Sequence, residues 1–144
     1  MTGTERVRVG SAVVGHERDL ELEGLGPIVA WRTLVDGDRT PTERITAGIA
    51  EIEPDAPVDG ALHHHADPEL YYFMEGTGAV HLDGEEHPVG PGSFVYVPGG
   101  AWHFVRNLGP ETLRFLYVFA VDRFAQVEYV FAPVTPPGAD RTSG

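Results

Sequence analysis

Apolar residues recur along this chain in short runs, and residues that favour turns separate the runs. Eighteen glycines and twelve prolines interrupt the sequence, so no long stretch keeps the 3.6-residue period of an amphipathic helix. The short pieces are rich in valine, isoleucine, phenylalanine and tyrosine, which favour strands. The pattern predicts an all-β chain with strands over 7–14, 28–35, 44–52, 61–65, 69–75, 78–83, 86–89, 93–97, 101–106, 112–121 and 126–131.

The strand expected over 112–121 is apolar on both faces. Side chains of a strand alternate between its faces, so one face carries Leu113, Phe115, Tyr117 and Phe119. Together with Phe73, we expect the three aromatic residues of that face to line an interior pocket for a small-molecule substrate. The other face carries Leu116, Val118 and Ala120. An apolar outer face needs cover, which predicts a homodimer.

The chain has 144 residues, which suits a single domain. Antiparallel strands in this number usually close into a double-sheet jelly roll or a small barrel. Residues 133–144 are rich in proline, glycine, serine and threonine, and they predict a flexible tail. We therefore expect one domain over 1–132, followed by that tail.

The composition excludes several classes of function. The net charge of −12 disfavours nucleic acid and anionic membrane surfaces as partners, because both need clustered basic residues. No apolar run is long enough to span a membrane and no signal peptide opens the chain, which favours a soluble cytoplasmic protein. There are no cysteines, which excludes disulfides and thiolate ligands. All ten basic residues are arginine, which excludes Schiff-base chemistry on lysine.

Three histidines and a glutamate have the spacing of a metal site. His63 and His65 are two residues apart, so on a strand they point to the same face. Glu69 follows after a turn, and His103 arrives from a distant strand. Three imidazoles and one carboxylate suit a single divalent ion, zinc first, with iron, manganese or nickel as alternatives. His64 is expected on the opposite face, away from the ion.

These residues fall within two motifs that resemble those of the cupins. The first motif contains His63, His65, Glu69 and Gly76, although Pro57 stands where the family has its leading glycine. The second contains Gly92, Pro98, Gly100, His103 and Asn107. The resemblance implies a single-domain cupin jelly roll, a double-stranded β-sandwich barrel, with the metal site described above. The family's activities include isomerases, oxygenases, lyases, cyclases and non-enzymatic binders, so the motifs do not specify the reaction.

Three residues are candidates for proton transfer beside the ion. Tyr71 lies two residues after Glu69 and shares its strand face, so we expect it to be the nearest acid or base that is not a ligand. The ion would favour its phenolate. Tyr96 stands two residues before Pro98, and His81 joins the candidate set if its ring points inward.

The leading functional hypothesis is a metal-dependent enzyme acting on a small hydrophobic oxygenated molecule. The chain's size, its aromatic pocket and a composition typical of GC-rich coding DNA, with arginine in place of lysine, favour a resemblance to small polyketide cyclases within the cupins. The first alternative is a cupin lyase that cleaves dimethylsulfoniopropionate, whose motifs carry tyrosines where this chain has Tyr71 and Tyr96. A sugar or keto isomerase, a dioxygenase and a non-catalytic small-molecule binder stay open as further alternatives.

Overall fold

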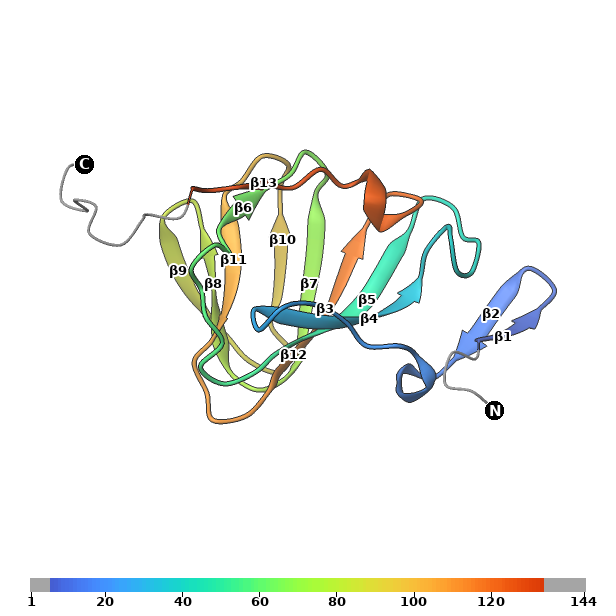
Figure 1. Cartoon of the computed structure of the whole chain (residues 1–144), viewed down its shortest axis with the longest axis horizontal. Coiled ribbons are helices and arrows are strands. Elements are labelled where there is room, and N and C mark those ends of the chain that lie inside the picture. Colours follow the sequence, from blue (N-terminus) through green and yellow to red (C-terminus); the bar gives the residue numbers. More distant parts are fainter. Residues whose placement is uncertain (1–5, 134–144) are drawn as a thin grey trace.

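The computed structural model describes residues 6–133, and within them the chain is almost entirely β-strand (Figure 1). Two short 3-10 helices, η1 (Glu17–Asp19) and η2 (Phe124–Gln126), interrupt the strands. The strands are β1 (Arg6–Val9), β2 (Ala12–Gly15), β3 (Glu23–Leu25), β4 (Val29–Val35), β5 (Thr46–Ile52), β6 (His63–His64), β7 (Glu69–Glu75), β8 (Gly78–Leu82), β9 (Glu85–Val89), β10 (Phe94–Val97), β11 (His103–Asn107), β12 (Leu113–Phe119) and β13 (Val130–Phe131).

Two antiparallel sheets form the body of the structure, with the core between them (Figure 1). The larger sheet has the order β10-β7-β12-β5-β4-β3, and the smaller one has the order β13-β6-β11-β8-β9. β1 and β2 pair only with each other. This arrangement confirms the all-β, double-sheet jelly roll that the strand pattern predicts.

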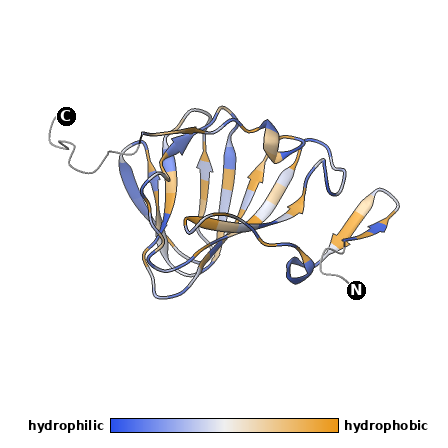
Figure 2. Ribbon diagram, viewed as in Figure 1, coloured by the Kyte–Doolittle hydropathy of each residue, from blue (hydrophilic) through white to orange (hydrophobic). Residues whose placement is uncertain are grey.

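The central strand β12 shows how the hydrophobic pattern positions the core. Burial alternates along it, with every second side chain from Leu113 to Phe119 buried and the intervening ones partly exposed. The register places Phe115 opposite Phe73 on β7 and opposite Ala50 on β5. The side chains predicted for the inner face of this strand are therefore the buried ones, and Figure 2 shows hydrophobic positions along the strands of the sheets.

Two predicted strands differ from the structure, and one short strand was not predicted. The strand predicted over 7–14 is a hairpin, because Gly10 has a positive φ of 62° and starts a tight turn between β1 and β2. The strand predicted over 126–131 is mostly η2 and loop, and only β13 at its end pairs with the sheet. The short strand β3 was not predicted. The tail predicted over 133–144 lies, apart from Pro133, outside the described residues.

The outer face of the larger sheet is apolar where β7 and β10 meet. Phe94 and Tyr96 on β10 are 74% and 61% exposed, and Leu70 and Tyr72 on β7 lie beside them in register. The half-buried Leu116 and Val118 of β12 continue this face. Of residues 6–133, no helix is long and apolar enough to cross a membrane.

We predict that the outer face of β7, β10 and β12 is the contact of a homodimer. Phe94→Glu should convert the dimer into a monomer, because it would bury an unpaired charge in an apolar contact. Light scattering would report the change as a mass falling to the 15.6 kDa of one chain. His87→Glu, at an exposed position of β9 in the other sheet, is the matched control and should stay dimeric. A wild-type monomer at micromolar concentration would contradict the prediction.

Candidate metal centre

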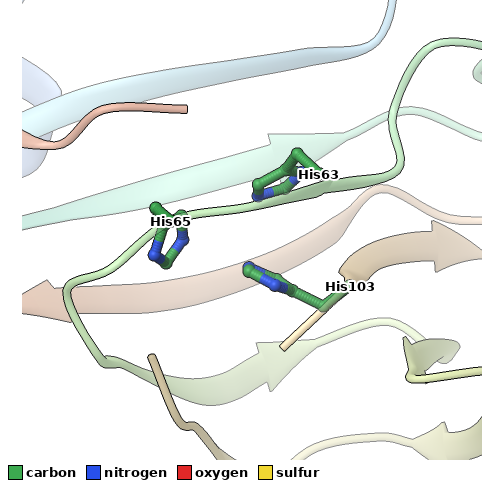
Figure 3. Close-up of side chains that lie close together, drawn as sticks. All are labelled: His63, His65 and His103. Atoms are coloured by element: carbon green, nitrogen blue, oxygen red, sulfur yellow. The ribbon is translucent and has the colours of Figure 1, made fainter. Parts of the chain in front are cut away.

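Three imidazoles from two distant parts of the chain converge between the sheets. His63 on β6 stands directly opposite His103 on β11 in the strand register, and His65 follows just after β6. One ring nitrogen from each histidine lies within 4.8 Å of those of the other two. Figure 3 shows His63 and His65 reaching from one segment toward His103, which comes from a neighbouring strand. The three predicted imidazole ligands are thus brought together.

Glycines in the second motif allow the turn after β10 to approach the segment that follows β6. Gly100 has a φ of 83°, and its amide donates to the carbonyl of His65 over 2.8 Å. A Cβ on Gly99 would lie only 2.2 Å from the carbonyl oxygen of Ala66, so a larger residue cannot fit there. The turn 98–100 therefore positions His65 on one side, and it leads into β11 with His103 on the other.

Backbone carbonyls set the tautomer of all three histidines. Nδ1 of His63, His65 and His103 lies 2.7, 2.7 and 2.8 Å from the carbonyl oxygens of Ala61, Asp67 and Ala101, respectively. A carbonyl oxygen only accepts hydrogen bonds, so each Nδ1 must carry the proton and donate it. In the neutral imidazole the lone pair is then on Nε2, which is the form that binds a metal ion.

The Glu69 carboxylate lies beside two of these imidazoles in a buried position. Its Oε1 is 3.3 Å from Nε2 of His65 and 3.5 Å from Nε2 of His103. All three atoms are buried and have no hydrogen-bond partner of regular geometry. A carboxylate oxygen facing two imidazole lone pairs is repulsive unless a cation sits among them. These orphaned atoms therefore fit a divalent ion with nitrogen and oxygen ligands.

In the metal-free protein, protons compensate part of this charge. Burial lowers the pKa of His63 to about 4, with the neighbouring His103 adding to the effect. Burial acts in the same direction on His65, but the Glu69 carboxylate, 3.3 Å from Nε2 of His65, favours the protonated imidazole; this effect outweighs burial and raises the pKa of His65. Burial would raise the pKa of Glu69, yet the imidazoles of His103 and His65 lower it. The site thus holds an ionised carboxylate among histidines and attracts a cation.

A cavity of about 320 Å³ opens next to the histidines. Both His63 and Glu69 reach its wall. Eight of its lining side chains are aromatic: Trp31, Tyr71, Phe104, Phe115, Tyr117, Phe124, Tyr129 and Phe131. Among the described residues, no arginine lines it. A metal site at one end of an aromatic cavity suits an oxygen-bearing head group attached to an apolar or cationic remainder.

The structure places Tyr71 at this site, fully inside. Its ring lies 6.3 Å from the ring of His103, and it lines the cavity beside Glu69. Burial raises the pKa of Tyr71 well above 10, and the negative charge of Glu69 adds to this. The phenol therefore keeps its proton in the metal-free protein.

Of the predicted pocket residues, the structure brings Phe115 and Tyr117 to the cavity wall. Phe73 and Phe119 do not reach it, because both are fully buried in the packing between the sheets. The ring of Phe73 lies 5.0 Å from Phe115, and that of Phe119 lies 5.2 Å from His65. They support the pocket from behind.

The other two candidate catalytic residues are not brought to the metal centre. Tyr96 points out of β10 and is largely exposed, while its neighbours Val95 and Val97 face the core. His81 alternates with the buried Val80, and its ring stacks on Phe104 at 4.9 Å rather than on any ligand. We do not carry either residue into the proposed mechanism.

Tyr129 is a residue of the site that the sequence pattern did not reveal. Its ring lies 4.8 Å from that of His63 and 5.1 Å from that of His65, closer than any ring distance from Tyr71 to a histidine. It lies between η2 and β13 and lines the cavity. Tyr129 and Phe131 are two residues apart, which on a strand would place both rings on one face. The residues before them show no clear strand pattern, so the sequence did not indicate that this face points to the metal centre.

The sequence is similar to proteins of one known family. A family model described as a cupin domain matches residues 48–119. Dimethylsulfoniopropionate lyase DddW of Ruegeria pomeroyi is 41% identical over 103 residues, which are 72% of this chain and 66% of that relative. The oxalate-binding protein of Thermotoga maritima is 32% identical over 59 residues, 41% of this chain and 49% of the relative. The chain thus spans only part of the length of these curated relatives.

Solved structures share the fold. The polyketide cyclase RemF of Streptomyces resistomycificus has a TM-score of 0.71 at 23% identity, covering 84% of this chain and 85% of that one. The oxalate decarboxylase of Lactobacillus farciminis, in a formate complex, has a TM-score of 0.70 at 25% identity, covering 85% of this chain and 36% of that one. At 23% identity, the likeness to the polyketide cyclase shows a shared fold alone.

We predict that His103→Ala removes the bound ion. The two remaining imidazoles come from one short segment, and without the opposing ligand from β11 they should hold no stoichiometric metal. Elemental analysis of the purified protein measures this directly. His64→Ala is the matched control. His64 lies on β6 between His63 and His65, but its ring packs edge-on against Trp102 at 4.4 Å. Full metal content in the His103 variant would contradict the assignment.

Proposed function

The chain belongs to the cupin family, and within that family we propose that it is a metal-dependent lyase. The proposed reaction removes a proton from the carbon next to a carboxylate or carbonyl group and expels a leaving group from the adjacent carbon. One observation supports the proposal most: Glu69 and Tyr71 stand together on β7, and both line the aromatic cavity beside the three histidines. This places a proton-transfer group beside a cation site, as such an elimination requires.

The residues divide the work between binding and proton transfer. His63, His65 and His103 would hold the ion, with Glu69 as a further ligand or close neighbour. When bound, a divalent ion supplies Lewis acidity toward a substrate oxygen and so makes the neighbouring carbon–hydrogen bond more acidic. The Nδ1 hydrogen bonds to backbone carbonyls keep the imidazoles oriented for that task.

Tyr71 is the proposed proton carrier. Without metal, burial and the charge of Glu69 hold the proton on its hydroxyl. A divalent ion held by the three imidazoles would oppose both the burial effect and the charge of Glu69. We therefore assign the loss of the Tyr71 proton to the metal-loaded protein. Tyr71 then accepts the proton from the substrate carbon as the carbon–carbon double bond forms. The electron pair of the carbon–hydrogen bond forms the double bond. The electron pair of the bond between carbon and the leaving group departs with that group.

The cavity wall supports a substrate class as well as a reaction. Because no arginine among residues 6–133 lines the cavity, a substrate carboxylate has no cationic partner there except at the metal end. The aromatic faces suit a cation such as a sulfonium group, which is attracted to the ring quadrupole. The relative that is 41% identical is a dimethylsulfoniopropionate lyase. We therefore propose an acid bearing a sulfonium leaving group as the first substrate to test.

A polyketide cyclase is the second candidate, and the cavity itself favours it. A volume of about 320 Å³ lined by aromatic and aliphatic side chains holds a larger, flatter molecule than a short sulfonium acid. Cyclisation begins with the same proton removal beside a carbonyl and differs in the bond that forms next. The substrate, and not the proton-transfer group, distinguishes the two reactions.

The decisive assay supplies dimethylsulfoniopropionate to the metal-loaded protein. We expect dimethyl sulfide in the headspace, measured by gas chromatography, together with the unsaturated acid in solution. The His103→Ala variant is the control and should release none above background. If the folded, metal-loaded wild type releases no sulfide, the lyase proposal is wrong. An aromatic product from a poly-β-ketone would then support the cyclase.

We predict that Tyr71→Phe lowers turnover by roughly 10²-fold while metal content and fold stay as in the wild type. The substitution keeps the buried ring and removes only the hydroxyl that carries the proton. Steady-state kinetics should show the loss in kcat rather than in KM, because substrate binding does not require proton transfer. Tyr96→Phe, at an exposed position on the adjacent strand, is the matched control. Wild-type turnover in the Tyr71 variant would reduce this residue to packing.

A further inference from the structure

The strand that carries His63 has little support of its own. β6 is two residues long, and on one side it is joined to β11 only through the pair His63 and His103. On the other side, β13 pairs with both of its residues, and the amide of Ala132 donates to the carbonyl of Leu62 over 2.9 Å. So short a strand is not stable unless its neighbours hold it. The chain from 124 to 132, named here the C-terminal strap, provides most of that hold.

The strap also packs a ring directly onto the metal ligands. The Tyr129 ring lies 4.8 Å from that of His63 with an interplanar angle of 31°, and 5.1 Å from that of His65. On the same strap, the ring of Phe131 lies 5.6 Å from His63. These contacts limit the rotation of the His63 imidazole, whose Nδ1 is bonded to Ala61. Nε2 is thereby kept pointing at the other two ligands.

We propose that Tyr129 is a positioning residue of the metal centre, holding the His63 imidazole in its ligating orientation through ring packing. This inference rests on the proposed metal site but not on the identity of the substrate. The ring, and not the hydroxyl, performs the task, since the contacts are between rings: a tilted one with His63 and an edge-on one with His65. Metal ligands that lose a supporting partner typically lose affinity by about 10- to 100-fold.

The same strap forms part of the cavity wall. Phe124, Tyr129 and Phe131 all line the cavity, and the strap is anchored in the core by the buried Val127. A metal ion that fixes His63 therefore also fixes β6 and the strap paired with it. Order in the wall and occupancy of the metal centre are coupled, and by linkage each stabilises the other.

The test compares three variants of the full chain by cobalt binding. The metal-stripped proteins are titrated with Co²⁺ against a competing chelator, and the visible absorption band of the bound ion is recorded. We expect Tyr129→Leu to bind Co²⁺ about 10- to 100-fold more weakly and with an altered band. Tyr129→Phe should restore both. Phe124→Leu is the matched control, because Phe124 lines the same cavity and meets Tyr129 at 5.6 Å, yet its other ring contacts are Trp31, Tyr117 and Phe119.

The outcomes separate this inference from the proposed function. A wild type that binds no Co²⁺ overturns the metal centre itself. A wild type that binds, with a Tyr129→Leu variant of equal affinity and band, overturns only the positioning role. Equal weakening in Phe124→Leu would also overturn it, because the effect would then be general loosening of the strap.

Hydrogen exchange on the wild type gives a measurement that does not depend on the variants folding. Addition of Co²⁺ should slow exchange of the strap amides, Ala132 above all, because its bond to Leu62 ties the strap to β6. Amides of the hairpin β1–β2, which pairs only with itself, serve as the internal control. Unchanged exchange in the strap on metal binding would contradict the coupling.

Discussion

The structure depends on a buried group of hydrogen-bond acceptors that needs a cation. Three imidazoles spend their Nδ1 protons on backbone carbonyls, so their Nε2 lone pairs face inward together with Oε1 of Glu69. Burying unpaired polar atoms costs free energy, and Nε2 of His65, Nε2 of His103 and Oε1 of Glu69 are buried without a hydrogen-bond partner. The opposite pKa shifts of His65 and Glu69 are the metal-free response to this constraint. A divalent ion satisfies the same atoms without any change in their orientation.

The two sheets contribute different parts of the centre, which explains why the whole fold is needed for it. The smaller sheet supplies His63 and His103 as a direct cross-strand pair, while the larger sheet supplies Glu69 and Tyr71 from β7. The segment between β6 and β7 carries His65 and joins the sheets. The ligands therefore meet only when both sheets have formed and packed against each other. The metal site requires the complete fold.

Sequence reasoning placed His63 and His65 together because their spacing is local and strand alternation is strict, whereas Glu69 and the distant His103 joined the candidate set through the two motifs that resemble those of the cupins. His63 and His65 share a face for the same reason that Phe115 and Tyr117 do, and both placements were predicted from strand parity. Parity gives relative faces and not the absolute one, and that limit explains the misplaced Tyr96. Its strand β10 is apolar on both faces. The hydrophobic pattern therefore could not show that Val95 and Val97, rather than Tyr96, face inward.

The remaining errors come from one local turn and from contacts between segments far apart in the chain. Tyr129 joins the site because the strap crosses β6, and no local pattern encodes that crossing. The hairpin β1–β2 was read as one strand, since a single glycine with positive φ decided the turn. Pocket depth was equally invisible: Phe73 and Phe119 share the inner face with the lining residues but lie behind them. A pattern assigns faces, whereas packing between layers decides which inward side chains reach a cavity.

The cavity and the metal centre constrain function to different degrees. In the proposed reaction the centre sets the first chemical event, since a proton carrier beside a Lewis-acid site favours proton removal next to a bound oxygen. It leaves the second event open, because elimination and ring closure both follow from that step. The cavity wall limits which substrates fit: in the part of the chain that the structure describes, no arginine lines the cavity, so a second anionic group on the substrate would be buried without a cationic partner. The cavity therefore favours substrates that carry one anionic or carbonyl head and otherwise present methyl, methylene, aromatic or cationic surface. Within that set, a good leaving group on the neighbouring carbon makes elimination the outcome, and a second carbonyl within reach of the carbanion makes cyclisation the outcome.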